Sequence, residues 1–203
     1  MALTSRKKRP LDRVVAVRDA RLIIIATEGE RSEPIYFDIF HSTRVRLHVV
    51  PCVDGKSSPE ATLERLNQFK QEYELDASDE LWLVIDRDRW TPKMISDIAR
   101  KCVSQRVNLA VSNPCFEVWL SFHYTSSIPA KLQSTTADGF FRSLHGSYKK
   151  GNYDPKPLLT RVRAAINHAE ALDNPKGRRW PVSVGSHVYI LMKSIIAAGV
   201  QIP

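Results

Sequence analysis

Cysteine is scarce in this chain, and its few cysteines form no recognisable site. The 203 residues include three cysteines, Cys52, Cys102 and Cys115, without any close CxxC spacing. An odd number of widely separated cysteines argues against a disulfide framework and a structural zinc site, and suits a reducing compartment. The six histidines also lack metal-ligand spacing such as HxxxH.

Long apolar runs and glycine-rich phosphate loops are missing too. The longest apolar runs are about five residues, far short of the roughly twenty that a membrane-spanning helix needs. The N-terminal stretch is basic and has no apolar segment like that of a secretory signal, so we expect a cytoplasmic protein without membrane association. There is no GxxxxGK motif and no nucleophile-elbow motif, which excludes a P-loop and gives no support to a serine hydrolase.

Positive charge is concentrated at the two ends of the chain. Residues 1–21 hold seven Lys and Arg against two Asp and Glu, and residues 145–180 hold eight against three. The centre, residues 22–144, holds fourteen against seventeen. Basic surfaces bind phosphate backbones through counterion release, so this pattern favours a nucleic-acid partner. For the N-terminal run, a solvated tail is the simpler alternative.

Apolar runs and amphipathic segments alternate through the first two thirds of the chain. The predicted strands are 22–27, 45–50, 81–85 and 107–111, and the predicted helices are 34–41 and those opened by Pro59, Pro92 and Pro114. Such alternation predicts βαβ units in a mainly parallel sheet with helices on both faces. Beyond residue 124 the pattern changes, with helices expected at 137–144, 157–172 and 186–198.

These segments predict three parts of the chain. Residues 1–20 are expected to form a basic flexible arm, with one strand turn at 14–17. Residues 21–124 form the α/β domain, and residues 125–203 form a mostly helical extension packed on it.

Two acidic stretches follow directly on predicted buried strands. Glu28 lies in TEGERSE, just after the first strand, and Asp86 and Asp88 lie in DRD, just after the third. Carboxylates at the ends of buried strands need cations, and open α/β sheets bind ligands at that edge. If the first and third strands are neighbours, these side chains can bind Mg²⁺ or Mn²⁺. The alternative is that they form surface salt bridges with neighbouring arginines.

Other charged residues are candidates for the same site. Glu117 lies near the start of a helix that follows the fourth strand, where it either serves the helix dipole or completes the site. Arg31, Arg87 and Arg89 can bind phosphate or neutralise the carboxylates. Lys149 and Lys150 lie between Tyr148 and Tyr153, a combination found on single-strand binding surfaces, although a plain exposed loop is the simpler explanation. The candidate nucleic-acid-binding residues are Arg31, Arg87, Arg89, Lys149 and Lys150.

Glu-Gly after the first strand and Asp-x-Asp after a later one resemble the pattern of Toprim domains, the metal-binding units of topoisomerases, primases and certain nucleases. A closer resemblance is to the RloB-like proteins, a bacterial family linked to restriction and abortive-infection loci. It rests on TEGERSEPIYF (27–37), DRD (86–88) and SNPCFEVWL (112–120).

The resemblance implies a Toprim-like three-layer α/β fold, Mg²⁺ or Mn²⁺ dependence and a nuclease role in phage defence, often beside an ABC- or AAA-type ATPase partner. By position, Glu28 matches the Toprim glutamate, and Asp86 and Asp88 match its aspartate pair. Many Toprim nucleases place a second acid where this chain has Ser32. Glu33 or Glu30 would have to replace it, and the sequence leaves that choice open.

Two functions follow from these patterns. The first is a metal-dependent nuclease in which Asp86 and Asp88 hold the metal and Glu28 is the general base or a further ligand. Glu33 and Glu117 are additional candidates for metal ligands. The second is a non-catalytic sensor that binds nucleic acid or a nucleotide and signals to an ATPase. The sequence does not decide whether the substrate is DNA or RNA, or whether the protein forms a homo-oligomer.

Overall fold

The computed structural model describes residues 20–52, 55, 57–72, 75–173 and 175–203. The predicted basic arm, except for residue 20, lies outside the described residues, as does the strand turn expected at 14–17. The elements in chain order are β1 (Arg21–Thr27), α1 (Ser32–Phe37), β2 (Val45–Val50), α2 (Pro59–Glu72), β3 (Glu80–Asp86), α3 (Pro92–Gln105), β4 (Asn108–Asn113), α4 (Phe116–Ser121), α5 (Ser134–His145), α6 (Lys156–Leu159), α7 (Val162–Leu172), β5 (Gly185–Ser186) and α8 (Val188–Ala197). Within these ranges every helix is too short or too polar to span a bilayer.

The strands form one sheet in the order β2-β1-β3-β4-β5. The first four are parallel, and β5 pairs antiparallel with β4. Because β1 and β3 are neighbours, their carboxyl ends lie at the same edge, with Thr27 opposite Val84. This is the adjacency that a shared acidic site requires.

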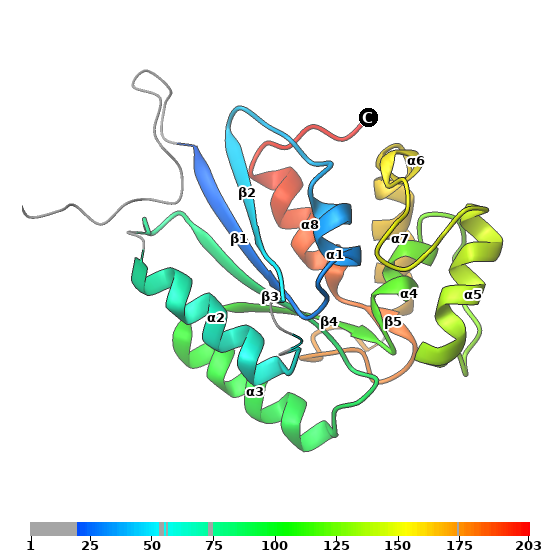
Figure 1. The fold of residues 1–203 in the computed structure, drawn as a ribbon, viewed down its shortest axis with the longest axis horizontal. Coiled ribbons are helices and arrows are strands. Elements are labelled where there is room, and N and C mark those ends of the chain that lie inside the picture. Colours follow the sequence, from blue (N-terminus) through cyan, green and yellow to red (C-terminus); the bar gives the residue numbers. More distant parts are fainter. Residues whose placement is uncertain (1–19, 53–54, 56, 73–74, 174) are drawn as a thin grey trace, which may run out of the picture.

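Helices cover both faces of the sheet, giving three layers (Figure 1). In β1, Ile23 and Ile25 face the layer that contains α1, α4, α7 and α8, whereas Ile24 and Ala26 face α2 and α3. Both sets are completely buried, as expected of a strand in a parallel sheet. The predicted class, an α/β fold with a mainly parallel sheet and C-terminal helices, is confirmed.

The structure corrects two predicted helix starts. The first helix begins at Ser32 rather than Pro34 and ends at Phe37, and Ile35 and Ile39 are only partly buried. The helix predicted to open with Asn113 as N-cap begins at Phe116 with Cys115 as N-cap, after a cis peptide bond between Asn113 and Pro114. Asn113 is still in β4, and its side-chain amide donates to three loop carbonyls instead of capping the helix.

Other helix predictions hold to within a few residues. Thr91 caps α3 by accepting a hydrogen bond from the backbone N–H of Met94, as its position before Pro92 predicts. Ile95 and Ile98 of α3 are buried, but Val103 is 76% exposed and does not belong to the core. The helix expected at 157–172 is divided into α6 and α7.

The C-terminal part also contributes to the sheet, which the sequence did not predict. The two-residue strand β5 adds to the edge of the sheet beside β4. Helix α8 packs on β4 through the larger hydrophobic core. The same core includes aromatic residues of α1 and α4, so segments from both ends of the chain share it.

Candidate functional site

The two acidic stretches meet at the carboxyl edge of the sheet. Glu28 directly follows β1, and its backbone N–H donates to the carbonyl of Val84 in β3 at 3.0 Å. The backbone N–H of Asp86, the last residue of β3, donates in return to Oε2 of Glu28 at 3.0 Å. The fold therefore fixes these two acidic positions side by side.

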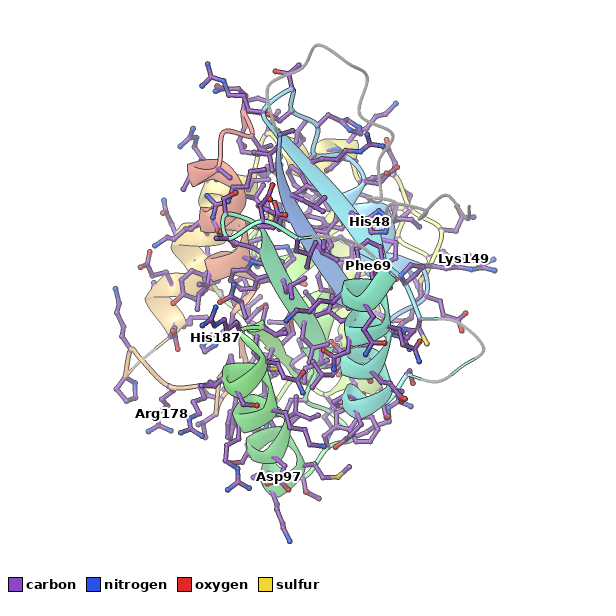
Figure 2. All side chains as sticks on the ribbon, turned by 90° about the vertical axis from the view of Figure 1, so that its left-hand side faces the viewer. His48, Phe69, Asp97, Lys149, Arg178 and His187 are labelled. Carbon is purple, nitrogen blue, oxygen red and sulfur yellow. The ribbon has the colours of Figure 1, made fainter. Side chains whose placement is uncertain are left out.

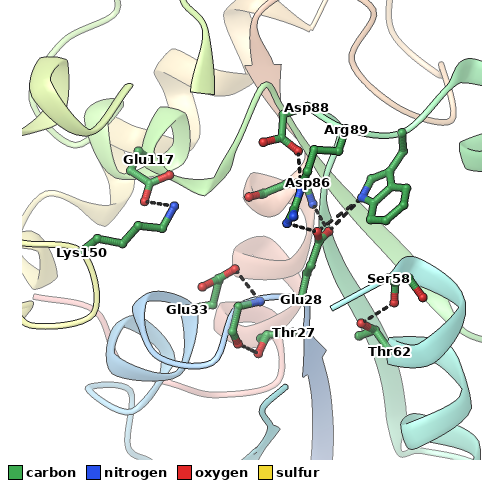
Figure 3. A network of polar contacts seen from close by, with 12 residues as sticks. Thr27, Glu28, Glu33, Ser58, Thr62, Asp86, Asp88, Arg89, Glu117 and Lys150 are labelled. Carbon is green, nitrogen blue, oxygen red and sulfur yellow. Dashed lines mark hydrogen bonds and ion pairs between the residues drawn. The ribbon is translucent and has the colours of Figure 1, made fainter. Parts of the chain in front are cut away.

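An open pocket of about 340 Å³ lies at this edge. Its charged lining residues are Glu28, Glu30, Glu33, Asp86 and Glu117, with Arg31, Arg89 and Lys150 as cations. Figure 3 shows the carboxyl groups of Glu28, Glu33 and Asp86 on one side and the Glu117–Lys150 pair on the other. The pocket thus combines residues from five separate segments of the chain.

Glu33, rather than Glu30, is the acid buried beside Glu28 and Asp86. Its carboxylate accepts a hydrogen bond from the backbone N–H of Gly29 at 3.1 Å, and the residue is 5% exposed. A Cβ at Gly29 would overlap that carboxylate, so only glycine allows this close approach. Glu30 is exposed and accepts from the backbone N–H of Gly55.

Ser32, where many Toprim nucleases carry an acid, has a different role here. Its hydroxyl accepts a hydrogen bond from the backbone N–H of Gly151 at 3.1 Å, and its carbonyl accepts one from the Tyr153 hydroxyl at 2.9 Å. Gly151 has a φ of 71° and lies against the Arg31 side chain. Ser32 therefore fastens the 148–153 segment to the loop that carries Glu28.

Glu117 reaches the pocket from the start of α4 and is 1% exposed. Its Oε1 accepts a hydrogen bond from the Tyr148 hydroxyl at 2.7 Å and forms an ion pair with Lys150 at 3.4 Å. Its Oε2 is buried and has no hydrogen-bond partner. Asp138 of α5 also interacts electrostatically with Glu117.

Glu28 also accepts hydrogen bonds from Trp90 and Arg89, which lie in the loop after β3. Both of its carboxylate oxygens lie within 3.4 Å of the indole nitrogen of Trp90. The Arg89 guanidinium lies 3.4 Å from Oε1 and also pairs with Asp88 at 3.6 Å. Arg89 is therefore held between Glu28 and Asp88.

Burial and mutual repulsion make this cluster unfavourable when fully ionised. Burial raises the pKa of Glu28 to about 7. The hydrogen bonds from the Asp86 backbone N–H and the Trp90 indole, and the charge of Arg89, oppose this rise. Burial, reinforced by Glu117, likewise raises the pKa of Glu33 to about 7. Burial raises the pKa of Asp86 well above its usual value, with further contributions from Glu33 and Glu28.

Glu117 is the exception. Burial would raise its pKa, but the Lys150 ammonium and the Tyr148 hydroxyl outweigh burial and lower the pKa below its usual value. Burial lowers the pKa of Lys150, but Glu117, Asp138 and Asp86 together raise it above the usual value. The cluster thus contains one stabilised ion pair among carboxylates that resist ionisation.

Three predicted site residues do not line the pocket. Asp88 lies in a turn after β3, which ends at Asp86, so the two aspartates are not on one extended strand face. The Arg87 guanidinium points to the carbonyls of Pro181 and Val182 and holds that loop. Lys149 extends outward, away from the body of the molecule (Figure 2).

The two tyrosines beside the lysines are not a base-stacking surface. Tyr148 is 2% exposed and Tyr153 8% exposed, and both rings pack against Phe141. His123 is a core residue between the Tyr36 hydroxyl and the carbonyls of Trp119 and Leu120. Burial lowers its pKa to about 3.

The site contains residues that sequence reasoning missed. Tyr148 and Trp90 donate hydrogen bonds to its carboxylates, and Asp138 interacts electrostatically with Glu117, yet none of the three lies in either acidic stretch. Only Tyr148 carried a signal, because it belongs to a polar segment with two aromatic residues. Trp90 and Asp138 have no local pattern that distinguishes them from ordinary helix and turn residues.

The donor set suits a hard divalent cation. Carboxylate oxygens are the ligands that Mg²⁺ and Mn²⁺ prefer. A cation would offset the burial, and the smaller contribution of repulsion, that raise the pKa values of Glu28, Glu33 and Asp86. The unpartnered Oε2 of Glu117 provides one further acceptor. As the side chains stand, no three His, Cys, Asp or Glu residues in the described ranges are arranged to hold one ion together. Binding would therefore require these carboxylates to turn.

Fold and site together define an α/β protein with an acidic pocket at the carboxyl edge of a mainly parallel sheet. A family model described as RloB-like protein matches residues 23–195, and the chain belongs to that family. No curated protein and no solved structure matches it.

Proposed function

We propose that this protein is a divalent-metal-dependent nuclease that hydrolyses phosphodiester bonds of DNA or RNA in bacterial defence against phage. The observation that supports this best is the gathering of Glu28, Glu33, Asp86 and Glu117 around one pocket. Three of them, Glu28, Glu33 and Glu117, are buried, and buried carboxylates destabilise a fold unless cations or hydrogen bonds compensate them. The defence role rests on family membership and resemblance.

In this proposal Asp86, Glu33 and Glu117 hold the metal, which when bound supplies Lewis-acid polarisation of the phosphate and an activated water. Glu28 acts as general base or as a further ligand.

Arg31 and Arg89 are the proposed phosphate-binding residues. Both line the pocket, and 64% of the Arg89 side chain is exposed. A guanidinium offers paired donors to phosphate oxygens, so Arg89 can exchange its carboxylate partners for a substrate phosphate. Asp88 then orients Arg89 from outside the pocket instead of binding metal, which differs from the role that the sequence suggested.

The test is cleavage of plasmid DNA, single-stranded DNA and total tRNA, with and without Mg²⁺ or Mn²⁺. Wild-type protein is expected to cut at least one substrate only with metal, and Asp86→Ala is expected to abolish cutting. Asp97→Ala, which removes an aspartate of α3 outside the pocket, is the matched control and should cut like wild type. Robust cleavage by Asp86→Ala would refute the proposal.

A second candidate is a sensor that binds nucleic acid and signals to an ATPase partner. One observation favours it: the cations Arg89 and Lys150 already pair with Glu28 and Glu117. Salt-sensitive binding of nucleic acid without metal, together with no cleavage of any substrate, would support this function. Expression with a candidate ATPase partner, followed by phage plating, tests the defence role in either case.

A further inference from the structure

The Lys150 ammonium lies among the carboxylates of the pocket. Its Nζ lies 3.4 Å from Oε1 of Glu117, and its charge also interacts with Asp138 and Asp86. In Figure 3 the Lys150 side chain runs toward Glu117 and ends on the side of the carboxylate group where Glu117 lies. Lys150 therefore supplies positive charge inside the pocket that the proposed metal would use.

The segment that carries Lys150 is held on both sides of it. Tyr148 donates to Glu117 through its hydroxyl, and its carbonyl accepts from the Arg142 side chain at 2.9 Å. Gly151 and Tyr153 are both hydrogen-bonded to Ser32. With anchors at 148, 151 and 153, the backbone of Lys150 has little freedom, and its direction into the pocket follows from the fold.

The two members of the ion pair differ in how easily they can move. The Glu117 side chain is 1% exposed, whereas the Lys150 side chain is 61% exposed. A long, partly exposed lysine can turn its ammonium into water without disturbing the packed core. Glu117 is enclosed, and its second oxygen has no partner. Lys150 is thus the mobile member of the pair, and Glu117 is the fixed acceptor.

We infer that Lys150 is an internal counter-ion that competes with the divalent cation for Glu117 and its neighbouring carboxylates. This rests on the proposed function, because it concerns the same pocket. An ammonium and a divalent cation repel each other strongly in a partly buried site. Metal binding therefore displaces Lys150 toward the pocket mouth, and the energy of that displacement lowers the metal affinity.

The inference is tested by titrating the full-length protein with Mn²⁺ alone, using calorimetry or electron paramagnetic resonance at pH 8. Lys150→Met is expected to bind Mn²⁺ tighter than wild type, by roughly five- to fiftyfold, because one repelling charge is removed. Lys150→Arg keeps the charge and should bind within about threefold of wild type. Lys149→Met, one residue away but outside the pocket, should match wild type because its charge is in water.

The possible results separate this inference from the proposed function. Equal or weaker Mn²⁺ binding by Lys150→Met, with ordinary binding by wild type, would refute the competition and leave the metal-dependent nuclease intact. Tighter binding without cleavage of any substrate would support the competition and refute the nuclease. If neither protein binds Mn²⁺, the competition and the metal centre are both wrong.

Discussion

Replacing Glu33 by glutamine is expected to stabilise the metal-free protein. Glu33 is 5% exposed, and its pKa in the fold is about 7 instead of 4.5. That rise corresponds to about 3 kcal/mol, at about 1.4 kcal/mol for each tenfold change in the acid dissociation constant. Glutamine keeps an oxygen to accept from Gly29 and carries no charge. We therefore expect Glu33→Gln to raise the free energy of unfolding at pH 8 by about 1–3 kcal/mol.

The pH dependence distinguishes this cause from a simple packing effect. Because the pKa of Glu33 is higher in the folded state, the wild-type protein binds more protons when folded between about pH 4.5 and 7. Its stability is therefore highest below this range and falls as the pH rises through it. The advantage of Glu33→Gln should be large at pH 8 and small at pH 5.

The assay is thermal unfolding in EDTA at both pH values. For a chain of this size, about 1–3 kcal/mol corresponds to a rise in Tm on the order of 2–10 °C at pH 8. The matched control is Glu64→Gln, which changes an exposed glutamate of α2 and should show no such pH-dependent gain. An unchanged or lower Tm for Glu33→Gln at pH 8, or an equal gain at pH 5, would contradict the electrostatic argument.

Three further substitutions test how neighbouring residues position the site. Gly29→Ala places a methyl group where the Glu33 carboxylate lies, so cleavage should fall on the order of 100-fold while circular dichroism stays unchanged; normal cleavage would show that this carboxylate is not needed. Tyr148→Phe removes the 2.7 Å hydrogen bond to Glu117 and should lower the free energy of unfolding in urea by about 2 kcal/mol. A decrease below about 0.5 kcal/mol would mean that Lys150 alone satisfies the Glu117 carboxylate. Arg87→Ala frees the loop carbonyls that the guanidinium holds, and trypsin should cut that loop faster than in wild type; an unchanged cutting rate would show that the loop is held by other contacts.

Much of the fold was predictable because local patterns carry it. Runs such as Leu22–Ala26 and Leu81–Ile85 have the composition of strands buried on both faces, and alternation with amphipathic helices specifies a parallel sheet. Thr91 before Pro92 specified the start of α3 by its capping chemistry. The two-residue strand β5 was missed because two residues have no periodicity to detect.

The sequence predicted where the strand-end residues lie, but not the directions of several side chains around them. Glu28 and Asp86 were predictable because both end parallel strands, and parallel strands end at a common edge. Asp88 and Arg87 were misplaced because the chain turns directly after Asp86, and a turn changes side-chain directions in a way that spacing does not reveal. Tyr148 and Tyr153 looked like exposed aromatics, but their rings complete a core around Phe141.

The sequence by itself determined the fold class, the family and the two acidic stretches, because these depend on composition and spacing along the chain. Only the tertiary structure decided that Glu33, and not Glu30, lies buried beside Asp86, and that Lys150 pairs with Glu117 from a segment more than thirty residues later. The physical reason is that burial and electrostatic repulsion depend on distances in space. Those distances are set by strand order and by the hydrogen bonds that fasten the 148–153 segment to Ser32.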